Sequence, residues 1–267
     1  MVEFDAAGIN IYAISYDSQA QLKKFAERYG ITFDLLSDDD STVIKRFGIL
    51  NTLIRPDDAM AERFYGIPWP GTYVVDSQGV VTEKFFQRHY ATRDSAGSLL
   101  HSALGKVLIP KESPQAVHQD ERLKITAFLG DEDLKLEYTS RIYVRIELAE
   151  GLHIYGEPLP EGFVATTVKV EETKGLRAGK PVYPKTTPKE FEGLDATLNI
   201  YEGIVDIAIP VTATKEVRNW GQKRTQDSLG VDLVVRYQAC TESVCHVPRT
   251  EELTLEIPLA EVMLPRR

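Results

Sequence analysis

The pattern of apolar residues changes near residue 110, and this change most constrains the fold. Over the first hundred residues, segments typical of strands alternate with segments typical of helices, an order that favours an α/β sheet. Beyond residue 121 the chain shows short runs rich in β-branched and aromatic residues, with turn residues between them and no long helical segment. The 267 residues therefore predict two domains, each with its own core.

The first region predicts strands and helices in alternation. Ile9–Ser15 lacks polar alternation throughout, as expected for a strand that is covered on both faces. Asp17 or Ser18 can cap the helix that follows, and Gly30 ends it. The other expected elements are a strand at 31–36, a helix ending at Gly48, a hairpin around 76–79 and a closing helix at 92–105.

The second region predicts an all-β domain. Residues 109–121 carry two prolines and lack apolar periodicity, so they predict a linker. Seven runs after it predict the strands of a β-sandwich: 123–129, 140–148, 163–170, 196–201, 204–212, 231–239 and 253–257. The expected fold class is thus α/β plus all-β, with domains at 1–108 and 122–267. Trp220 is interpreted as a packed anchor of a loop.

Composition excludes several functions. The formal net charge of −9 leaves no basic stripe for nucleic acid or anionic lipid. A hydrophobic content of 43% indicates a folded globular protein, and no apolar run approaches membrane-spanning length. No phosphate loop is visible, and we expect no cofactor. Residues 1–8 lack the features of a signal peptide, so the residues themselves leave the compartment unknown.

Cys240 and Cys245 are the two cysteines of the chain, so thiol chemistry within it must pass through them. One strand-like run ends at the pair, and another, Glu251–Ile257, follows it. The four residues between the cysteines then form a hairpin-like tip that brings the sulfurs within bonding reach.

The length of this loop favours a reactive disulfide over a structural one. Bridging so short a loop stabilises a fold by only about 2 kcal/mol, whereas small exposed loops can hold readily reduced disulfides. His246, if protonated, would favour a thiolate at Cys245, and Glu242 would oppose it. The residues alone leave open an inert hairpin disulfide and two reduced cysteines that merely lie near each other. No metal site is expected, because there is no second cysteine pair and the histidines show no ligand spacing.

Four motifs of the first region resemble the redoxin branch of the thioredoxin-like superfamily, which holds the AhpC/TSA-type peroxiredoxins. They are YAISYD at 12–17, LLSD at 35–38, IKRFG at 44–48 and PGTYVVD at 70–76 with Gly79. The resemblance implies that Pro70 is the cis-proline that lies beside the redox site in such folds. The residues alone indicate only a turn at Trp69–Pro70.

The same resemblance implies a domain that is incomplete at its N-terminus. The family carries its nucleophilic cysteine upstream of these motifs, and residues 1–108 contain none. Residues 2–8 then correspond to the end of the helix that bears it. Two explanations stay open: the chain is a fragment, or the domain has evolved to do without the nucleophile. In either case, residues 1–108 cannot perform peroxidase or thiol chemistry themselves.

Motifs of the second region resemble the N-terminal periplasmic domain of DsbD, the thiol:disulfide interchange protein, over about residues 122–258. They are GLHIYGEPLP at 151–160, VYP at 182–184, LNIYEG at 198–203 and the stretch from Arg236 through both cysteines to Pro248. The resemblance implies an immunoglobulin-like sandwich, a periplasmic location and an electron-carrying role for Cys240 and Cys245. It also implies that the loop after His153, with Tyr155 and Phe163, caps the disulfide, although each aromatic ring is equally compatible with core packing.

The leading hypothesis is therefore a thiol:disulfide oxidoreductase that exchanges disulfides with thioredoxin-like or other thiol-redox proteins. The first alternative is a peroxiredoxin-type antioxidant whose nucleophile lies outside this chain. The second is a non-catalytic binding module. Neither nucleic acid nor a membrane-spanning segment enters any of these hypotheses.

Overall fold

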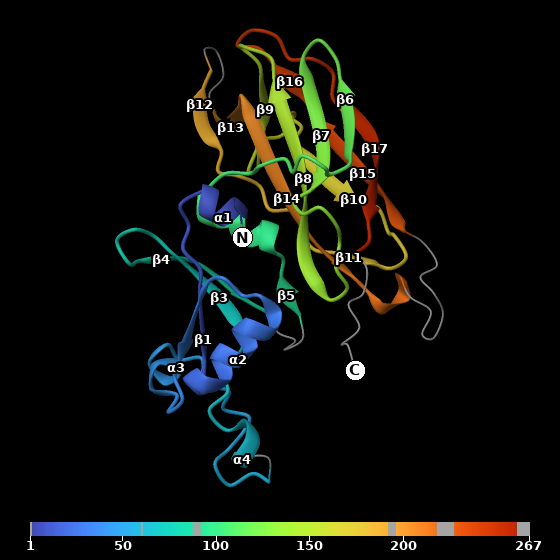
Figure 1. The fold of residues 1–267 in the computed structure, drawn as a ribbon. Helices are drawn as coiled ribbons and strands as arrows, with labels where there is room; N and C mark the ends of the chain where they lie inside the picture. The colour runs from blue at the N-terminus through green and yellow to red at the C-terminus, as the bar shows by residue number, and fades with distance from the viewer. Residues whose placement is uncertain (1, 60, 88–91, 192–195, 218–226, 261–267) are drawn as a thin grey trace. The chain divides into compact units, whose positions relative to one another are not determined.

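The computed structural model describes residues 2–59, 61–87, 92–191, 196–217 and 227–260, which form two compact units (Figure 1). The first runs to Arg93 and includes Ser102–Gly105, and the second holds Asp94–His101 and the residues from Lys106 onward. Within the described residues, each helix is too short or too polar to cross a bilayer. Trp220 lies outside the described residues.

The first unit contains two small sheets together with helices. Its elements are α1 (Val2–Ala6), β1 (Tyr12–Ser15), α2 (Gln19–Tyr29), β2 (Asp34–Ser37), α3 (Thr42–Arg46), α4 (Ala61–Phe64), β3 (Gly71–Val75) and β4 (Val81–Phe86). β1 pairs with β2 in parallel across the α2 crossover, and β3 pairs with β4 as an antiparallel hairpin. The order of elements confirms the α/β expectation for this region.

The ends of α2 follow from residues that the sequence singles out. The Ser18 side chain accepts a hydrogen bond from the Gln21 backbone N–H, and the Gln21 side-chain oxygen accepts one from the Ser18 backbone N–H, which completes a capping box. At the other end Gly30 adopts φ 64°, a left-handed conformation that suits glycine. Both predicted helix boundaries are confirmed.

The environment of β1 differs from the prediction. Tyr12 is 62% exposed and Ile14 is 37% exposed, so the strand is not covered on both faces. Among the described residues β1 pairs with β2 alone, in a two-stranded sheet that is too small to bury both sides of an apolar strand. An apolar run can indicate a strand, but it does not show whether other elements bury both of its faces.

The second unit is a β-sandwich. Its strands are β6 (Gln115–Gln119), β7 (Leu123–Leu129), β8 (Tyr138–Leu148), β9 (His153–Tyr155), β10 (Thr167–Val170), β11 (Leu176–Ala178), β12 (Thr187–Glu190), β13 (Thr197–Glu202), β14 (Ile204–Ala213), β15 (Ser228–Tyr237), β16 (Ala239–Cys240) and β17 (Arg249–Pro258). One sheet has the order β11-β14-β8-β7-β6, a second has β10-β15-β17, and a third has β12-β13-β9-β16 (Figure 1). The remaining elements are the two-residue strand β5 (Arg93–Asp94), helix α5 (Ala96–Leu104) and the short helix η1 (Lys215–Val217).

Alternating side chains of facing strands build the sandwich core. Val231, Leu233 and Val235 of β15 are fully buried and belong to one cluster with Ile142 of β8 and Ile207 of β14. Each such aliphatic side chain contributes roughly 1.5–3 kcal/mol relative to an exposed one. This core confirms the predicted fold class and carries the strands that position the cysteines.

Two elements depart from the predicted domain boundaries. β6 lies inside the predicted linker at 109–121 and pairs antiparallel with β7. Its residues alternate between exposed and half-buried, so its apolar signal is weak, as is usual for an edge strand. The first part of α5, predicted to close the first domain, clusters with the sandwich, where the Gly97 backbone N–H donates to Asp131 Oδ1 at 2.9 Å.

Candidate functional site

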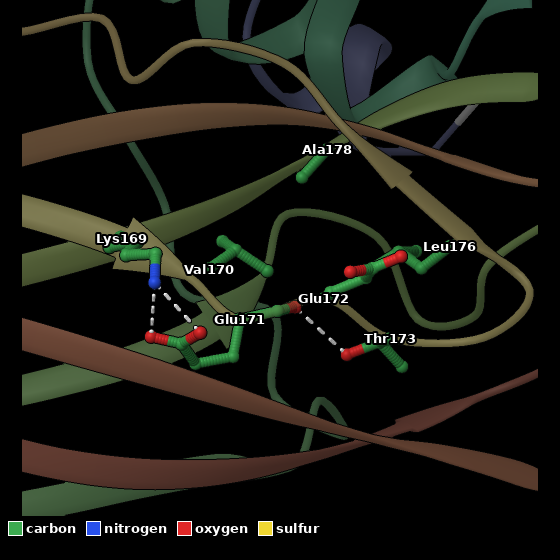
Figure 2. A pocket seen from close by; sticks show the side chains of 7 residues that line it. All are labelled: Lys169, Val170, Glu171, Glu172, Thr173, Leu176 and Ala178. Atoms are coloured by element: carbon green, nitrogen blue, oxygen red, sulfur yellow. Dashed lines mark hydrogen bonds and ion pairs between the residues drawn. The ribbon is translucent and has the colours of Figure 1, made fainter.

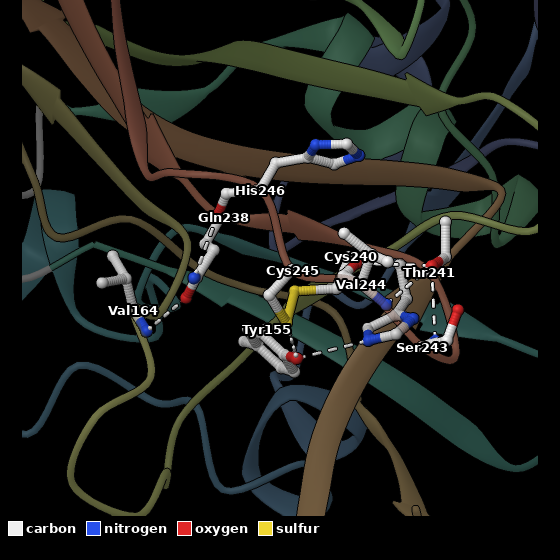
Figure 3. Close-up of a disulfide and its surroundings, with 10 residues drawn as sticks. Tyr155, Val164, Gln238, Cys240, Thr241, Ser243, Val244, Cys245 and His246 are labelled. Carbon is white, nitrogen blue, oxygen red and sulfur yellow. Dashed lines mark hydrogen bonds between the residues drawn. A yellow bond between two sulfur atoms is a disulfide. The ribbon is translucent and has the colours of Figure 1, made fainter.

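Cys240 and Cys245 form a disulfide in the structure (Figure 3). Their Cα atoms lie 4.1 Å apart, and the two residues also form an antiparallel β-bridge. The expectation that the loop brings the sulfurs within bonding reach is confirmed. The alternative of two separate reduced cysteines does not describe this state of the protein.

The disulfide lies in a loop that joins two sheets. β15 and β17 pair along their whole length, ending at Tyr237 opposite Arg249, which confirms the predicted hairpin. Between them β16 leaves this hairpin and pairs with β9 of the four-stranded sheet. A tight turn closes the tip, because the Thr241 backbone N–H donates to the Val244 carbonyl at 2.8 Å.

The two cysteines differ in their accessibility. Cys240 lies on β16 and is completely buried, whereas Cys245 is exposed at the tip. Two exposed apolar residues flank Cys245, Val244 at 55% and Val247 at 78%. An incoming thiol therefore has access to Cys245 before Cys240.

Two aromatic side chains of β9 face the disulfide. His153 is paired opposite Cys240, and Tyr155, two residues further along, projects from the same face of the strand. The Tyr155 hydroxyl lies 3.2 Å from Cys245 Sγ (Figure 3) and 3.4 Å from His153 Nε2. The three groups thus form a continuous series of polar contacts that ends on Cys245 Sγ.

Further aromatic rings surround these contacts. Phe163 contacts the Tyr155 ring edge-on at a centroid distance of 5.2 Å, and Phe191 lies 5.0 Å from the His153 ring. Tyr155 and Cys240 share a buried cluster against which Phe163 packs. Tyr155 thus lies on a strand, not in the loop after His153, while Phe163 reaches the site through Tyr155. A capping role for this loop stays a prediction.

Burial shifts the pKa values of His153 and Tyr155 on β9. It lowers the pKa of His153, and nearby Lys189 lowers it further, against the opposing effects of Glu202 and Glu242. Burial also raises the pKa of Tyr155. At neutral pH, with the disulfide intact, the imidazole and the phenol are therefore both neutral.

The residues expected to modulate the cysteines lie differently from what their sequence neighbourhood indicates. Figure 3 shows the His246 ring directed away from the disulfide. Glu242 forms an ion pair with Lys189 at 3.4 Å, on a side chain that is 81% exposed. The influence of these two residues on the cysteines stays a prediction.

Gln238 is a site residue that sequence reasoning missed. Its Oε1 accepts a hydrogen bond from the Val164 backbone N–H at 3.1 Å, and its Nε2 donates to the His246 carbonyl at 3.1 Å (Figure 3). One side chain thus ties the loop after β9 to the segment that follows Cys245. The available signal was a polar residue between a buried strand and a cysteine.

The expectation for Pro70 is wrong in its peptide geometry. Among the described residues the cis peptide bond is Glu157–Pro158, not Trp69–Pro70. The segment before Pro70 is held extended, because the Trp69 backbone N–H donates to the Ile49 carbonyl at 2.6 Å beside a Leu50–Pro68 bridge.

A surface pocket lies apart from these groups (Figure 2). It has a volume of about 420 Å³ and is lined by residues 169–173 with Leu176 and Ala178. Its Lys169 is paired with Glu171 at 2.7 Å, and no cysteine or aromatic ring lines it. Nor do three or more metal-ligating side chains gather anywhere in the described part of the chain. The disulfide is therefore the candidate functional site.

An α/β unit with redoxin motifs and a β-sandwich with a partly exposed disulfide define a protein of thiol–disulfide redox chemistry. The chain belongs to the family of the thiol:disulfide interchange protein DsbD, N-terminal domain, whose family model matches residues 115–257. Residues 1–84 match the model of the AhpC/TSA family. Both predicted resemblances are confirmed, and together with the bridged cysteines they support a general thiol–disulfide redox role.

Curated relatives match the first region. Chloroplastic peroxiredoxin Q from Sedum lineare is 38% identical over 79 residues, which cover 30% of this chain and 37% of that protein. Peroxiredoxin Bcp from Escherichia coli is 29% identical over 89 residues, covering 32% of this chain and 51% of that protein. The chain thus spans about a third to a half of the length of these relatives.

Solved structures were also found to be similar. The N-terminal periplasmic domain of ScsB from Proteus mirabilis aligns with a TM-score of 0.38 and 16% identity, over 56% of this chain and 53% of that one. The reduced DsbD N-terminal domain of Neisseria meningitidis aligns with a TM-score of 0.30 and 19% identity, over 57% of this chain and 91% of that one.

Proposed function

We propose that this protein is a thiol:disulfide oxidoreductase that relays electrons between thiol-redox proteins through Cys240 and Cys245. The observation that carries the proposal is the unequal exposure of a bridged pair, with Cys240 buried and Cys245 at the surface. A structural disulfide needs no accessible sulfur, whereas thiol–disulfide exchange requires one. Membership in the DsbD N-terminal family supports the same reaction.

The proposed reaction begins at Cys245. A partner thiolate attacks Cys245 Sγ, so that a partner–Cys245 bond forms while the Cys240–Cys245 bond breaks and Cys240 leaves as a thiolate that takes up a proton. The second thiol of the partner, as its thiolate, then attacks the partner sulfur of this mixed disulfide and releases Cys245. Two electrons pass from the partner to the pair. In the opposite direction, the Cys245 thiolate attacks a partner disulfide and Cys240 resolves the intermediate.

The partners we propose are thioredoxin-like or other dithiol proteins. Val244 and Val247 present apolar side chains beside Cys245, and these would contact a partner that brings its own sulfur to this point. The redoxin-like region, which contains no cysteine, would not itself take part in the sulfur chemistry.

A redox titration tests the proposal. The full chain is equilibrated with mixtures of reduced and oxidised glutathione, then with reduced thioredoxin, and the thiol state is read from the mass added by alkylation. We expect a potential within about −180 to −260 mV, where glutathione buffers and exchange is feasible. A potential well below this range, with no mixed disulfide trapped in Cys240→Ser or Cys245→Ser, would instead identify a structural disulfide.

A second candidate is a peroxiredoxin-type antioxidant, and the match of residues 1–84 to the AhpC/TSA family favours it. In that proposal the peroxide-reducing cysteine lies outside this sequence and the sandwich serves as its reductant. We expect this chain to consume no peroxide with dithiothreitol as electron source. Peroxide consumption that is lost in a Cys240→Ser/Cys245→Ser variant would place peroxidase chemistry at the sandwich pair and contradict the relay.

A further inference from the structure

In the series of contacts from His153 through Tyr155 to Cys245, the Tyr155 hydroxyl lies between two possible hydrogen-bond acceptors. The exchange reaction does not require this arrangement. A phenol carries one hydrogen that it can donate, and here two acceptors compete for it: His153 Nε2 at 3.4 Å and Cys245 Sγ at 3.2 Å. A disulfide sulfur is a weak acceptor, whereas a thiolate is a strong one. The redox state of Cys245 therefore decides which acceptor receives the hydrogen.

The surroundings isolate the His153 and Tyr155 side chains from water. His153 is 1% exposed and Tyr155 is 2% exposed, and Phe191 and Phe163 pack against their rings. Hydrogen bonds between buried groups are stronger than those in water, and an unpaired buried group is costly. Tyr155 and His153 consequently need each other as partners in both redox states.

The charged groups that face His153 come from three neighbouring segments. They are Lys189 of β12, Glu202 of β13 and Glu242 of the cysteine loop. Lys189 bridges both carboxylates, at 3.3 Å to Glu202 and 3.4 Å to Glu242. One cation and two anions leave a negative balance, which tolerates a proton on the imidazole once a further stabilising charge appears on sulfur.

We propose that His153 is a positioning residue for Cys245: acting through Tyr155, it holds a hydrogen bond on the thiolate of the reduced protein and takes up a proton when the disulfide is reduced. The proposal rests on the exchange reaction proposed above. In the oxidised protein the Tyr155 O–H donates to the His153 Nε2 lone pair. In the reduced protein Nε2–H of the imidazolium donates to the Tyr155 oxygen, and the Tyr155 O–H donates to the Cys245 thiolate.

The protons and electrons of this step balance. Oxidation of a partner dithiol to its disulfide supplies two electrons and two protons. The electrons cleave the Cys240–Cys245 bond and leave both sulfurs reduced. One proton goes to Cys240, which is buried away from water, and the other goes to His153, which leaves Cys245 as the thiolate that attacks the next disulfide.

The test measures the pH dependence of Cys245 alkylation by iodoacetamide in the full chain with Cys240→Ser, where Cys245 is the one thiol. Adding Tyr155→Phe or His153→Phe removes a link of the chain but keeps a ring in the core. We expect the thiolate fraction at pH 7 to fall about tenfold in each. His153→Gln keeps an N–H donor without the titrating proton, so we expect it to restore part of the thiolate fraction.

His101→Gln is the matched control. His101 is also buried, at 6% exposure, and its Nδ1 lies 3.1 Å from the Tyr143 hydroxyl in the same unit, but no sulfur adjoins that pair. We expect the control to leave the alkylation profile unchanged. Identical profiles with and without the His153 and Tyr155 substitutions would overturn the proposal, as would a control that shifts the profile equally.

A second measurement does not depend on the variants folding. The titration of the His153 ring protons is followed by NMR in the wild-type chain, oxidised and then reduced with dithiothreitol. The proposal requires a higher His153 pKa in the reduced state, and an unchanged pKa contradicts it. Because neither measurement uses a protein partner, failed exchange with thioredoxin would remove the proposed function, while these results would still decide the role of His153.

Discussion

At the disulfide, burial separates two sulfurs that the sequence presents as a symmetric pair. Cys240 lies on the edge strand β16 and is completely buried, whereas Cys245 lies in the exposed turn after it. The imidazole that reaches this sulfur indirectly is His153, not the adjacent His246. Local chemistry at the site is therefore set by pairing between strands that are distant in the sequence.

Gln238 connects two segments that surround the disulfide. Replacing it with Ala leaves the Val164 N–H and the His246 carbonyl without this partner, so we expect a loss of about 1–3 kcal/mol in the free energy of unfolding. We also expect faster reduction by dithiothreitol, because the loop after β9 is released. Urea unfolding and thiol kinetics measure both effects. Gln115→Ala, at an exposed position of β6, serves as the control. Equal effects of the two substitutions would contradict the role of Gln238 in holding the two segments together.

At the scale of elements, the cap of α2 is a property that the sequence predicts directly. Ser18→Ala removes the capping box with Gln21, and we expect a loss of about 1 kcal/mol. Hydrogen exchange of the α2 amides measures this loss. Glu27→Ala, on the exposed side of the same helix, should leave their protection almost unchanged. Undiminished protection in the Ser18 variant would show that the cap contributes nothing.

The β15–β17 hairpin positions the cysteine loop through its core residues. Leu233 is fully buried between the sheets, and its replacement by Ala should cost roughly 2–5 kcal/mol by leaving a cavity. Val117→Ala, at a residue 52% exposed on β6, should cost less than 1 kcal/mol. Thermal unfolding measures the loss of stability in both variants. A similar loss at the two positions would contradict the assigned core.

Elements with strong local signals were predictable from the sequence, and elements defined by distant pairing were not. The prediction placed β7 at 123–129, its observed bounds, because seven consecutive residues carry β propensity. β9 and β16 were missed because they have three and two residues, and each exists only through its partner strands. Since these two strands build the site, the sequence identified its cysteines and Tyr155 but not the contact chain through His153.

For the molecule as a whole, the buried His101 and His153 predict a stability that depends on pH. Burial is the first cause that lowers the pKa values of His101 and His153 below 6.5. The unfolded chain then binds protons more readily than the folded protein as the pH falls below about 6.5. The stabilisation is fully present above this pH and is lost as the pH falls through the lowered folded-state values.

Urea unfolding of the oxidised chain between pH 7.5 and pH 5 measures this dependence. We expect the free energy of unfolding to fall with decreasing pH, and to fall less steeply in His101→Gln, which removes one titrating group. A free energy that rises toward acid pH would show that one or both imidazoles are better protonated in the folded state than in the unfolded chain.

A mapping experiment can locate the sulfur that an incoming thiol attacks first. The oxidised full chain is mixed briefly with reduced glutathione and quenched with acid, and the adduct is mapped by peptide mass spectrometry under nonreducing conditions. We expect glutathione on Cys245, which is exposed, and little on Cys240, which is completely buried. Glutathione attached mainly to Cys240, or a disulfide that never opens, would contradict it.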